Sequence, residues 1–335
     1  MAARVTIMEQ NPRRGEIVDL RGIPVRDLEP LLADEIREWR TELDWDFEPS
    51  ADLVRKYAGT SSLGGAALIL DRQVAGYGYA VLEEPRGIIG DIYVRPHLRA
   101  AASEYEIFRS LLDALIATPR ITRMESQLML LTPESAALIA GINAAGANAS
   151  HRPVHLFGRR LMSRASHLRL PAVGAHVRTR FRFEPWEDHL MHTAGAIIAA
   201  AYKGETDSEI NAQYRSPGGA RRFLSNIVDF PGCGTFHKSA SFVAFDSRTG
   251  EAAGMVLSSF VSLEAGHISQ LCVMPDFRGS GLGNELLRTA AASLYQHGAQ
   301  RISLTVTASN TTAISIYEKF GFHTVRDFFA YIWEA

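Results

Sequence analysis

Hydrophobic and polar positions in the second half of the chain switch repeatedly between a period of two and a period near four. Residues 268–273 form an apolar run with the character of a buried strand. A glycine-rich turn follows, and apolar residues then recur at three- and four-residue spacing across residues 282–294, which predicts an amphipathic helix. Residues 301–307 alternate as a strand does, and residues 312–320 return to the helical period. The pattern predicts strand, loop, helix, strand and helix in this order.

The other segments of this half are predicted from the same two periods. They are a strand at 177–183, a helix at 186–202, a helix at 219–228, two adjacent strands within 242–256, and a last strand near 328–333. A polar loop, residues 203–214, separates the first two helices.

The first half carries a diverged copy of this pattern. Residues 87–99 repeat residues 266–278 at a constant offset of 179 positions, and glycine, valine, proline and arginine coincide. An amphipathic helix follows each copy, and two strands that read as a hairpin precede each one. The repeat predicts two tandem domains, residues 1–170 and 176–335, which meet in a stretch of small residues.

Composition agrees with two ordinary globular domains and excludes several classes of protein. The chain has 335 residues, of which 46% are hydrophobic and 21% charged, and its net charge is −2. This charge gives no general attraction to nucleic acid or to an anionic membrane, and no apolar stretch reaches membrane-spanning length. The basic residues between Arg159 and Arg169 are interpreted as a solvated strand edge or linker.

Cysteine usage and the N-terminus indicate a reducing compartment. Two cysteines, Cys233 and Cys272, are too few for a disulfide framework in so long a chain. Residues 1–14 hold neither the apolar region nor the cleavage-site pattern of a secretory leader. We therefore expect a cytoplasmic protein. No cluster of histidine, cysteine and carboxylate residues has metal-ligand spacing, so we expect no metal.

The glycine-rich turn after residue 273 has the composition of an anion-binding loop. Three glycines beside Arg278 let backbone N–H groups point into the loop, and the following helix adds the positive end of its dipole. A Walker loop would need Gly-Lys-Ser/Thr here, and a dinucleotide loop would need Gly-x-Gly-x-x-Gly. The observed spacing is Arg-x-x-Gly-x-Gly. It resembles the acyl-CoA loop of the GCN5-related N-acetyltransferases, the GNAT family.

A second signature lies at a fitting distance. Residues 310–322 have asparagine first, alanine at the fourth position, tyrosine at the eighth and Gly-Phe at the end. This is similar to the GNAT element in which the chain leaves the fifth strand and enters the last helix. The resemblance covers residues 176–335 at full strength.

The resemblance implies the fold and the ligand. It implies an α+β fold of two tandem GNAT-type domains, each a mixed, mainly antiparallel sheet flanked by helices, of which the second is active. Two central strands should splay apart, so that a pantetheine arm of acetyl-CoA can pair with the free backbone of one of them. The cofactor-binding candidates are Leu271, Cys272, Val273, Arg278, Gly279, Ser280, Gly281, Leu282, Gly283 and Asn310.

Two of these candidates have a structural alternative. Arg278 either contacts the pyrophosphate or orders the loop by its own hydrogen bonds. Asn310 contacts the pantetheine arm, caps the last helix, or does both.

The first domain has lost the corresponding loop. Alanine at positions 100, 101 and 102 replaces the glycines, and Glu104 places a negative charge where a pyrophosphate would lie. No tyrosine between residues 121 and 155 matches Tyr317. We interpret this domain as one without acyl-CoA binding. It serves either as a scaffold for the second domain or as one wall of the substrate cleft.

Two residues are catalytic candidates. The resemblance places the Tyr317 hydroxyl near the thioester sulfur, where it could protonate the departing CoA thiolate; the alternative is a core aromatic. His267 stands where histone-type members of the family have a glutamate base, and a neutral imidazole could accept the proton of the amine. Its alternative is an exposed histidine at a sheet edge. Glu264, Ser269 and Gln270 are weaker candidates.

The loop at 203–214 commonly shapes the acceptor site in this family. Glu205, Asp207 and Glu209 could attract a cationic amine and Tyr214 could stack on it, or the loop is a solvated acidic segment.

The expected function is transfer of an acetyl group from acetyl-CoA to a primary amine by direct attack in a ternary complex. Neither cysteine suggests a covalent intermediate. The alternative is a non-catalytic acyl-CoA-binding sensor or interaction module. The amine is a small molecule or a protein group, no nucleic acid or membrane is expected as a partner, and a homodimer is one of the open oligomeric states.

Overall fold

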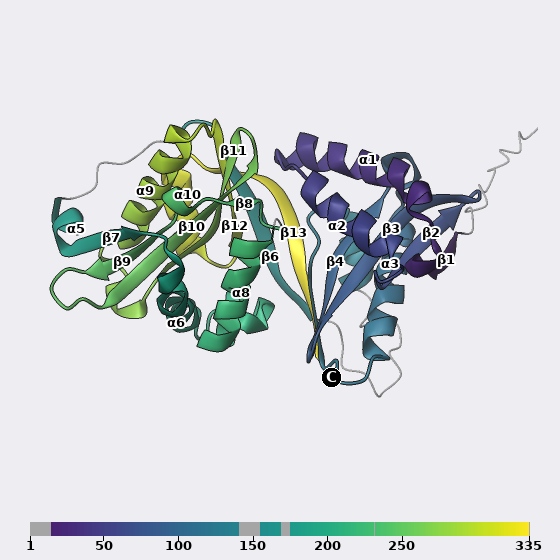
Figure 1. The fold of residues 1–335 in the computed structure, drawn as a ribbon, viewed down its shortest axis with the longest axis horizontal. Coiled ribbons are helices and arrows are strands. Elements are labelled where there is room, and N and C mark those ends of the chain that lie inside the picture. Colours follow the sequence, from purple (N-terminus) through teal and green to yellow (C-terminus); the bar gives the residue numbers. More distant parts are fainter. Residues whose placement is uncertain (1–14, 141–154, 169–174, 231, 335) are drawn as a thin grey trace, which may run out of the picture.

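A computed structural model describes residues 15–140, 155–168, 175–230 and 232–334 (Figure 1). One thirteen-stranded sheet runs through these residues in the order β1-β2-β3-β4-β5-β13-β6-β12-β11-β10-β9-β7, and β8 pairs with β10. The pairs β4–β5 and β11–β12 are parallel, and the other pairs are antiparallel. The predicted α+β class with mixed, mainly antiparallel sheets is confirmed.

The elements up to α4 form what we call the N-terminal half. They are β1 (Glu16–Asp19), α1 (Val25–Leu43), α2 (Glu48–Gly59), β2 (Gly65–Leu70), β3 (Gln73–Glu83), β4 (Arg86–Val94), α3 (Ala101–Ile116), β5 (Arg123–Gln127) and α4 (Pro133–Ala140). The next described element is strand β6 (His155–Ala165).

The elements after β6 form the C-terminal half. They are α5 (Ala175–Arg180), β7 (Phe181–Pro185), α6 (Met191–Ala201), α7 (Thr206–Ile210), the 3-10 turn η5 (Ala212–Arg215), α8 (Pro217–Asp229), β8 (Thr235–Phe236), β9 (Phe242–Asp246), β10 (Ala252–Ser262), β11 (Ala265–Val273), the 3-10 turn η7 (Pro275–Phe277), α9 (Leu282–Gln296), β12 (Arg301–Thr307), α10 (Thr311–Lys319) and β13 (His323–Glu334).

Helices cover both faces of the C-terminal sheet. On one face, α9 buries the apolar stripe that its sequence predicts, and all six members are at most 1% exposed: Leu282, Leu286, Leu287, Ala290, Ala291 and Leu294. On the other face, α6 and α8 pack over residues such as Met255, Leu257 and Cys272. The core therefore lies in two layers, with the central strands between them.

Strands β6 and β13 each pair with a strand of the other half of the chain. Strand β6, which precedes the C-terminal half, pairs with β12 through residues 160–165. Strand β13 pairs with β6 on one side and with β5 of the N-terminal half on the other. Figure 1 shows both strands in the middle of the molecule, between the two groups of helices. The division at residues 170 and 176 stays a proposal, because the first segment ends with a strand that lies among those of the second.

One predicted strand is wrong over its first residues. The alternation at 177–183 predicts a strand, but residues up to Arg180 form α5 and the strand begins at Phe181. Val177 and Phe181 both lie in the core cluster that contains α9. Val177 is buried from α5 and Phe181 from the first position of β7, so both reach the core although a helical turn precedes the strand. Among the described residues, no helix is long and apolar enough to cross a membrane.

Candidate active site

The central strands β11 and β12 separate where the sequence places a binding site. Their parallel pairing covers Ala265–Ile268 against Arg301–Leu304. Beyond that point β12 continues along β6, and β11 continues along β10 after a β-bulge at Ser269. Within the described strands no pairing joins the second halves of β11 and β12. The inner edge of Leu271–Val273 therefore lacks a partner strand, and the carbonyl of Leu271 accepts a hydrogen bond from the Tyr202 hydroxyl at 3.4 Å.

The loop that follows β11 leads directly into the N-terminus of α9. Gly279 and Gly281 have φ angles of 75° and 84°, in the left-handed region that favours glycine. Gly281 is the N-cap residue of α9 and has no side chain that could cap the helix. A Cβ atom at Gly281 would also lie 3.2 Å from Cγ2 of Val177. The uncapped first turn provides backbone N–H groups and the positive end of the helix dipole.

The other loop residues close the turn. The Ser280 hydroxyl donates to the carbonyl of Phe277 at 2.6 Å and accepts from the Leu282 amide at 3.4 Å. A Cβ atom at Gly283 would be in ordinary contact with Val273, at 3.6 Å. Gly283 is therefore less constrained by the surrounding protein than Gly281.

Arg278 fixes the loop to the end of α6. Its guanidinium donates to the Ala201 carbonyl at 2.6 Å and to Glu205 Oε1 at 3.0 Å. Half of the side chain remains exposed. Arg278 thus orders the loop by its own hydrogen bonds. The exposed part of its side chain is still free to contact a pyrophosphate.

Helix α10 lies on the other side of the separation. The Asn310 side chain accepts from the Ala313 amide at 3.1 Å, which is an N-cap bond. Tyr317 lies on α10 with its ring edge-on to Phe322, at a centroid distance of 5.9 Å. Burial, with smaller contributions from Asp207 and Cys272, raises the pKa of the Tyr317 phenol above its ordinary value. Its hydroxyl is therefore protonated at neutral pH.

A network of two tyrosines and a glutamine lies at the free edge of β11. The Gln270 amide donates to the Tyr202 hydroxyl at 2.8 Å, and the Tyr214 hydroxyl donates to Gln270 Oε1 at 3.3 Å. The two tyrosine rings are stacked at 4.8 Å. Burial raises the pKa of both phenols, so both remain hydrogen-bond donors.

A second polar group lies at the end of β12. Arg160 of β6 donates to Asp207 Oδ1 and to the Thr307 hydroxyl, both at 2.6 Å, and Thr307 donates to the same Asp207 oxygen at 3.0 Å. Arg160 lies in the basic segment that the sequence suggested was a strand edge or linker. Arg160 reaches Asp207 and Thr307 because β6 lies beside β12. No residue spacing in the sequence indicates that these two strands are neighbours.

His267 is buried, not exposed at a sheet edge. Its Nδ1 lies 2.9 Å from the Ser303 hydroxyl, and its ring meets Trp45 of the N-terminal half edge-on at 5.2 Å. Burial lowers the pKa of the imidazole to about 4. The group is therefore neutral at physiological pH, and the N-terminal half helps to enclose it.

The acidic side chains of the 203–214 loop have arginine partners. Glu205 pairs with Arg278, Asp207 with Arg160 at 2.6 Å, and Glu209 with Arg215 at 2.7 Å. Each pair reduces the attraction of the carboxylate for a cationic amine. The carboxylates of Glu205 and Glu209 are about half exposed, whereas Ser208 and Ile210 of the same loop are buried.

Both cysteines have protonated thiols. Burial raises the pKa of Cys272 to about 12 and that of Cys233 to about 11. Because the thiolate is the nucleophilic form, neither side chain is suited to a covalent intermediate. In the part of the chain that the structure describes, no group of three or more histidine, cysteine and carboxylate residues could hold a metal ion.

In the N-terminal half, the loop that corresponds in sequence to the loop after β11 contains Arg99, which contacts the carboxyl groups of Glu38 and Glu104. Arg99 donates to both oxygens of Glu38 at 2.8 Å. Glu104, 1% exposed, lies 3.3 Å from Arg99 and accepts from the amide and hydroxyl of Thr132 at 3.1 and 2.9 Å. The carboxyl group of Glu104, which the sequence places at this loop, is thus bonded within the protein.

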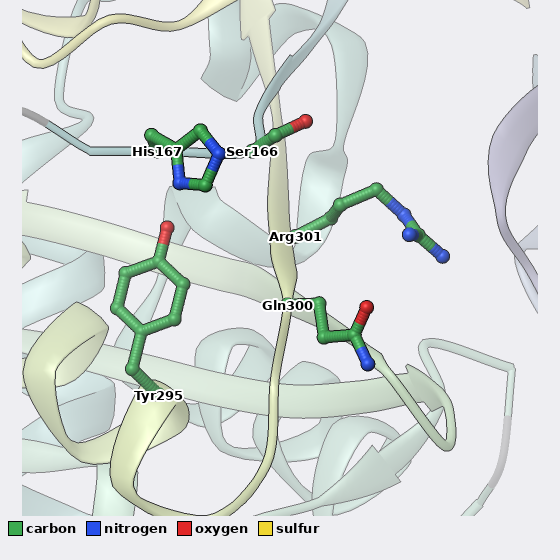
Figure 2. A pocket seen from close by; sticks show the side chains of 5 residues that line it. All are labelled: Ser166, His167, Tyr295, Gln300 and Arg301. Atoms are coloured by element: carbon green, nitrogen blue, oxygen red, sulfur yellow. The ribbon is translucent and has the colours of Figure 1, made fainter.

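One open pocket lies away from these groups. It has a volume of about 390 Å³ and is lined by Ser166, His167, Tyr295, Gln300 and Arg301. Figure 2 shows the Tyr295 hydroxyl facing His167, while Arg301 extends to the other side of the strand. Arg301 begins β12, six residues before Thr307, or roughly 20 Å along a strand. This pocket is therefore distinct from the separation of β11 and β12.

Comparisons with known proteins agree on one family. Residues 208–322 match the model of the acetyltransferase (GNAT) family. Mycothiol acetyltransferase of Corynebacterium glutamicum (strain R) is 40% identical over 55 residues, 16% of this chain and 19% of that protein. The [ribosomal protein bS18]-alanine N-acetyltransferase of Escherichia coli (strain K12) is 33% identical over 82 residues, 24% of this chain and 55% of that protein. The matches thus span between a fifth and about half of these relatives.

Solved structures match almost the whole chain. A GCN5-related N-acetyltransferase from Sphaerobacter thermophilus has a TM-score of 0.66 at 15% identity, with 96% of each chain covered. A tandem GNAT protein from the clavulanic acid biosynthesis pathway has a TM-score of 0.55 at 14% identity, with 96% of this chain and 98% of that chain covered. These similarities confirm the predicted tandem fold, including that of the N-terminal half.

Proposed function

The C-terminal half of this chain belongs to the acetyltransferase (GNAT) family, and we propose that it transfers an acetyl group from acetyl-CoA to a primary amine. Family membership implies acetyl-CoA as the co-substrate and an amine as the acceptor. The acceptor itself is not defined by the distant relatives. A cytoplasmic location and a homodimer stay predictions.

The observation that carries the proposal is the separation of β11 from β12 beside the uncapped N-terminus of α9. The free edge of Leu271–Val273 can pair with the amides of a pantetheine arm, as an added strand does. The loop from Gly279 to Gly283 can bind a pyrophosphate through backbone N–H groups. Arg278 and Asn310 hold the two ends of this surface in place through the bonds described above.

In the proposed reaction the neutral amine attacks the thioester carbon and the CoA thiolate leaves. Tyr317 keeps its proton at neutral pH, so it can donate a hydrogen bond and then a proton to the departing sulfur. The raised thiol pKa values of both cysteines support direct attack in a ternary complex over an acyl-cysteine intermediate.

His267 is our candidate for the base. Its Nδ1 is bonded to Ser303, which leaves Nε2 as the atom to accept the proton of the amine, directly or through water. Its lowered pKa makes it a weaker base than an exposed histidine, but it is unprotonated and so able to accept a proton at neutral pH. The alternative is that the amine loses its proton to solvent before it binds.

The first experiment is a calorimetric titration of acetyl-CoA into the full chain, followed by turnover assays with a panel of primary amines. We expect one site per chain, because the N-terminal loop is filled by Glu104. Two sites would overturn our interpretation of the N-terminal half. Binding with no turnover on any small or protein amine would favour the alternative, a non-catalytic acyl-CoA sensor.

A further inference from the structure

The loop between α6 and α8 contacts both strands of the proposed active site. Its residue Asp207 is bonded to Thr307 of β12, and its residue Tyr214 is bonded to Gln270 of β11. The other side of the same loop contacts the N-terminal half. We propose that Glu125 of the N-terminal half is a positioning residue that fixes this loop and thereby sets the acceptor side of the active site. The inference rests on the proposed function.

Glu125 is a shared acceptor for groups from both halves. It lies on β5 and is 7% exposed. Its Oε1 accepts from Arg123 Nε at 2.6 Å and from the backbone amide of Ala212 at 2.9 Å, and its Oε2 accepts from Arg86 Nη1 at 2.7 Å. One carboxylate thus orients two guanidinium groups and the backbone of the loop between α6 and α8, which we call the acceptor loop.

The two arginines extend the contact along the loop. Arg86 Nη1 also donates to Asn211 Oδ1 at 3.3 Å, and Arg123 Nη2 donates to the backbone carbonyl of Glu209. Both arginines are only 7% exposed. Next to them, Gln213 of the loop donates to Glu83 Oε1 at 3.0 Å. We call Glu83, Arg86, Arg123 and Glu125 the β3–β5 cluster.

The bonded part of the loop is continuous with the tyrosine network. Asn211, which accepts from Arg86, also accepts from the Gln213 amide at 3.0 Å and so caps the turn η5. Tyr214 lies in η5, where its ring stacks on Tyr202 and its hydroxyl bonds Gln270. A shift of η5 would therefore move the groups that border the free edge of β11.

The burial of Arg86, Arg123 and Glu125 indicates that this contact does more than hold the two halves together. Two buried guanidinium groups are costly to desolvate, and apolar side chains would join two domains at least as well. Directed bonds from buried charges do provide a fixed geometry, since each bond has a preferred distance and angle. The β3–β5 cluster directs such bonds to the backbone of the loop at two residues, Glu209 and Ala212.

The test compares Glu125→Gln with Glu104→Gln in the full chain. Both positions hold a buried glutamate of the N-terminal half that contacts arginine, but Glu104 bonds Thr132 and not the acceptor loop. Hydrogen exchange at residues 206–215 is measured with and without acetyl-CoA. Acetyl-CoA affinity is measured by calorimetry, and KM and kcat are measured with the primary amine that the wild-type chain uses best in the panel.

We expect both variants to lose stability and only Glu125→Gln to change the loop. In that variant, exchange at 206–215 should rise about tenfold or more and KM for the amine should rise at least fivefold, with acetyl-CoA affinity within twofold of wild type. If Glu125→Gln does not fold, Asn211→Ala removes the loop-side partner of Arg86 and should show the same pattern.

Equal exchange at 206–215 in the two glutamine variants would overturn the proposal. A wild-type chain that transfers to no amine would refute the proposed function, while the exchange result would still decide whether Glu125 fixes the loop.

Discussion

The indole of Trp45 lies edge-on against the imidazole of His267, with 5.2 Å between the ring centroids. The tryptophan belongs to the N-terminal half, and the histidine belongs to the strand that borders the proposed active site. The backbone amide of the neighbouring Asp46 also donates to the carbonyl of Val261 at 2.6 Å. The N-terminal half therefore contacts the C-terminal half at the central strands as well as at the loop that Glu125 bonds.

Burial of His267 predicts a loss of stability at acidic pH. The folded-state pKa of about 4 lies below the ordinary value of 6.5, so the unfolded chain binds the proton more readily. Stability contributed by this group is complete above about pH 6.5 and is lost as the pH falls toward 4. The loss amounts to about 2 kcal/mol between pH 7.5 and pH 5. Thermal unfolding at these two pH values should show a steeper fall for the wild-type chain than for His267→Gln.

The same variant tests the role of His267 as a base. A rate that depends on neutral imidazole should fall only below about pH 4 to 5, and this acidic limb should disappear in His267→Gln. An unchanged profile in the variant would exclude the histidine and leave deprotonation to solvent.

Tyr317→Phe should lower kcat with little change in acetyl-CoA affinity. The phenol is protonated at neutral pH and is replaced by a side chain of nearly the same shape, so the packing against Phe322 is kept. Loss of a general acid typically costs roughly 10²-fold or more in rate. Steady-state kinetics beside calorimetry separate the two effects, and an unaffected kcat would remove the acid role.

Gly281→Ala should abolish tight acetyl-CoA binding. The residue has a φ of 84°, and a Cβ there would approach Val177 to 3.2 Å, so the loop must move. Gly250→Ala is the matched control, because its φ is 75° and nothing lies within 4 Å of its Cβ position. Both variants should lose about 1 kcal/mol of stability through backbone strain. Equal acetyl-CoA affinities in the two variants would contradict the loop assignment.

Arg160 and Asp207 should act as a unit. Arg160→Gln and Asp207→Asn should each lower kcat/KM for the amine, and the double variant should lose little more than either single one. The short bonds to one Asp207 oxygen predict a coupling energy of roughly 1–3 kcal/mol. A double-mutant cycle in kcat/KM measures it. Strictly additive effects would mean that the two side chains act independently.

The features predicted best from the sequence are those set by local pattern. Strand β12 has the predicted bounds, 301–307. Its apolar residues Ile302, Leu304 and Val306 are buried on one face, and Ser303 and Thr307 on the other face are buried as well. The buried stripe of α9 is predicted equally well, since it depends on neighbours in the chain.

The acceptor side could not be predicted in this way. The bonds of Arg160 to Asp207 and Thr307 join residues that are 47 and 147 positions apart, and they exist only because β6 lies beside β12. Periodicity states which face of a strand is buried but not which strand is its neighbour. For the same reason the partners of Glu125 in the acceptor loop were not foreseen.

The place of β13 between β5 and β6 has a consequence for biosynthesis. Strand β13 is made long after β5, yet it supplies the neighbour that covers the edge of β5. At about 5–20 residues per second, the ribosome needs on the order of ten seconds or more after β6 to release it. During that interval β5 keeps an unpaired edge, which is a template for association with other chains. Neither half can complete its hydrogen bonding before β13 is made, so the edge of β5 stays without its partner longer than it would in two independent domains.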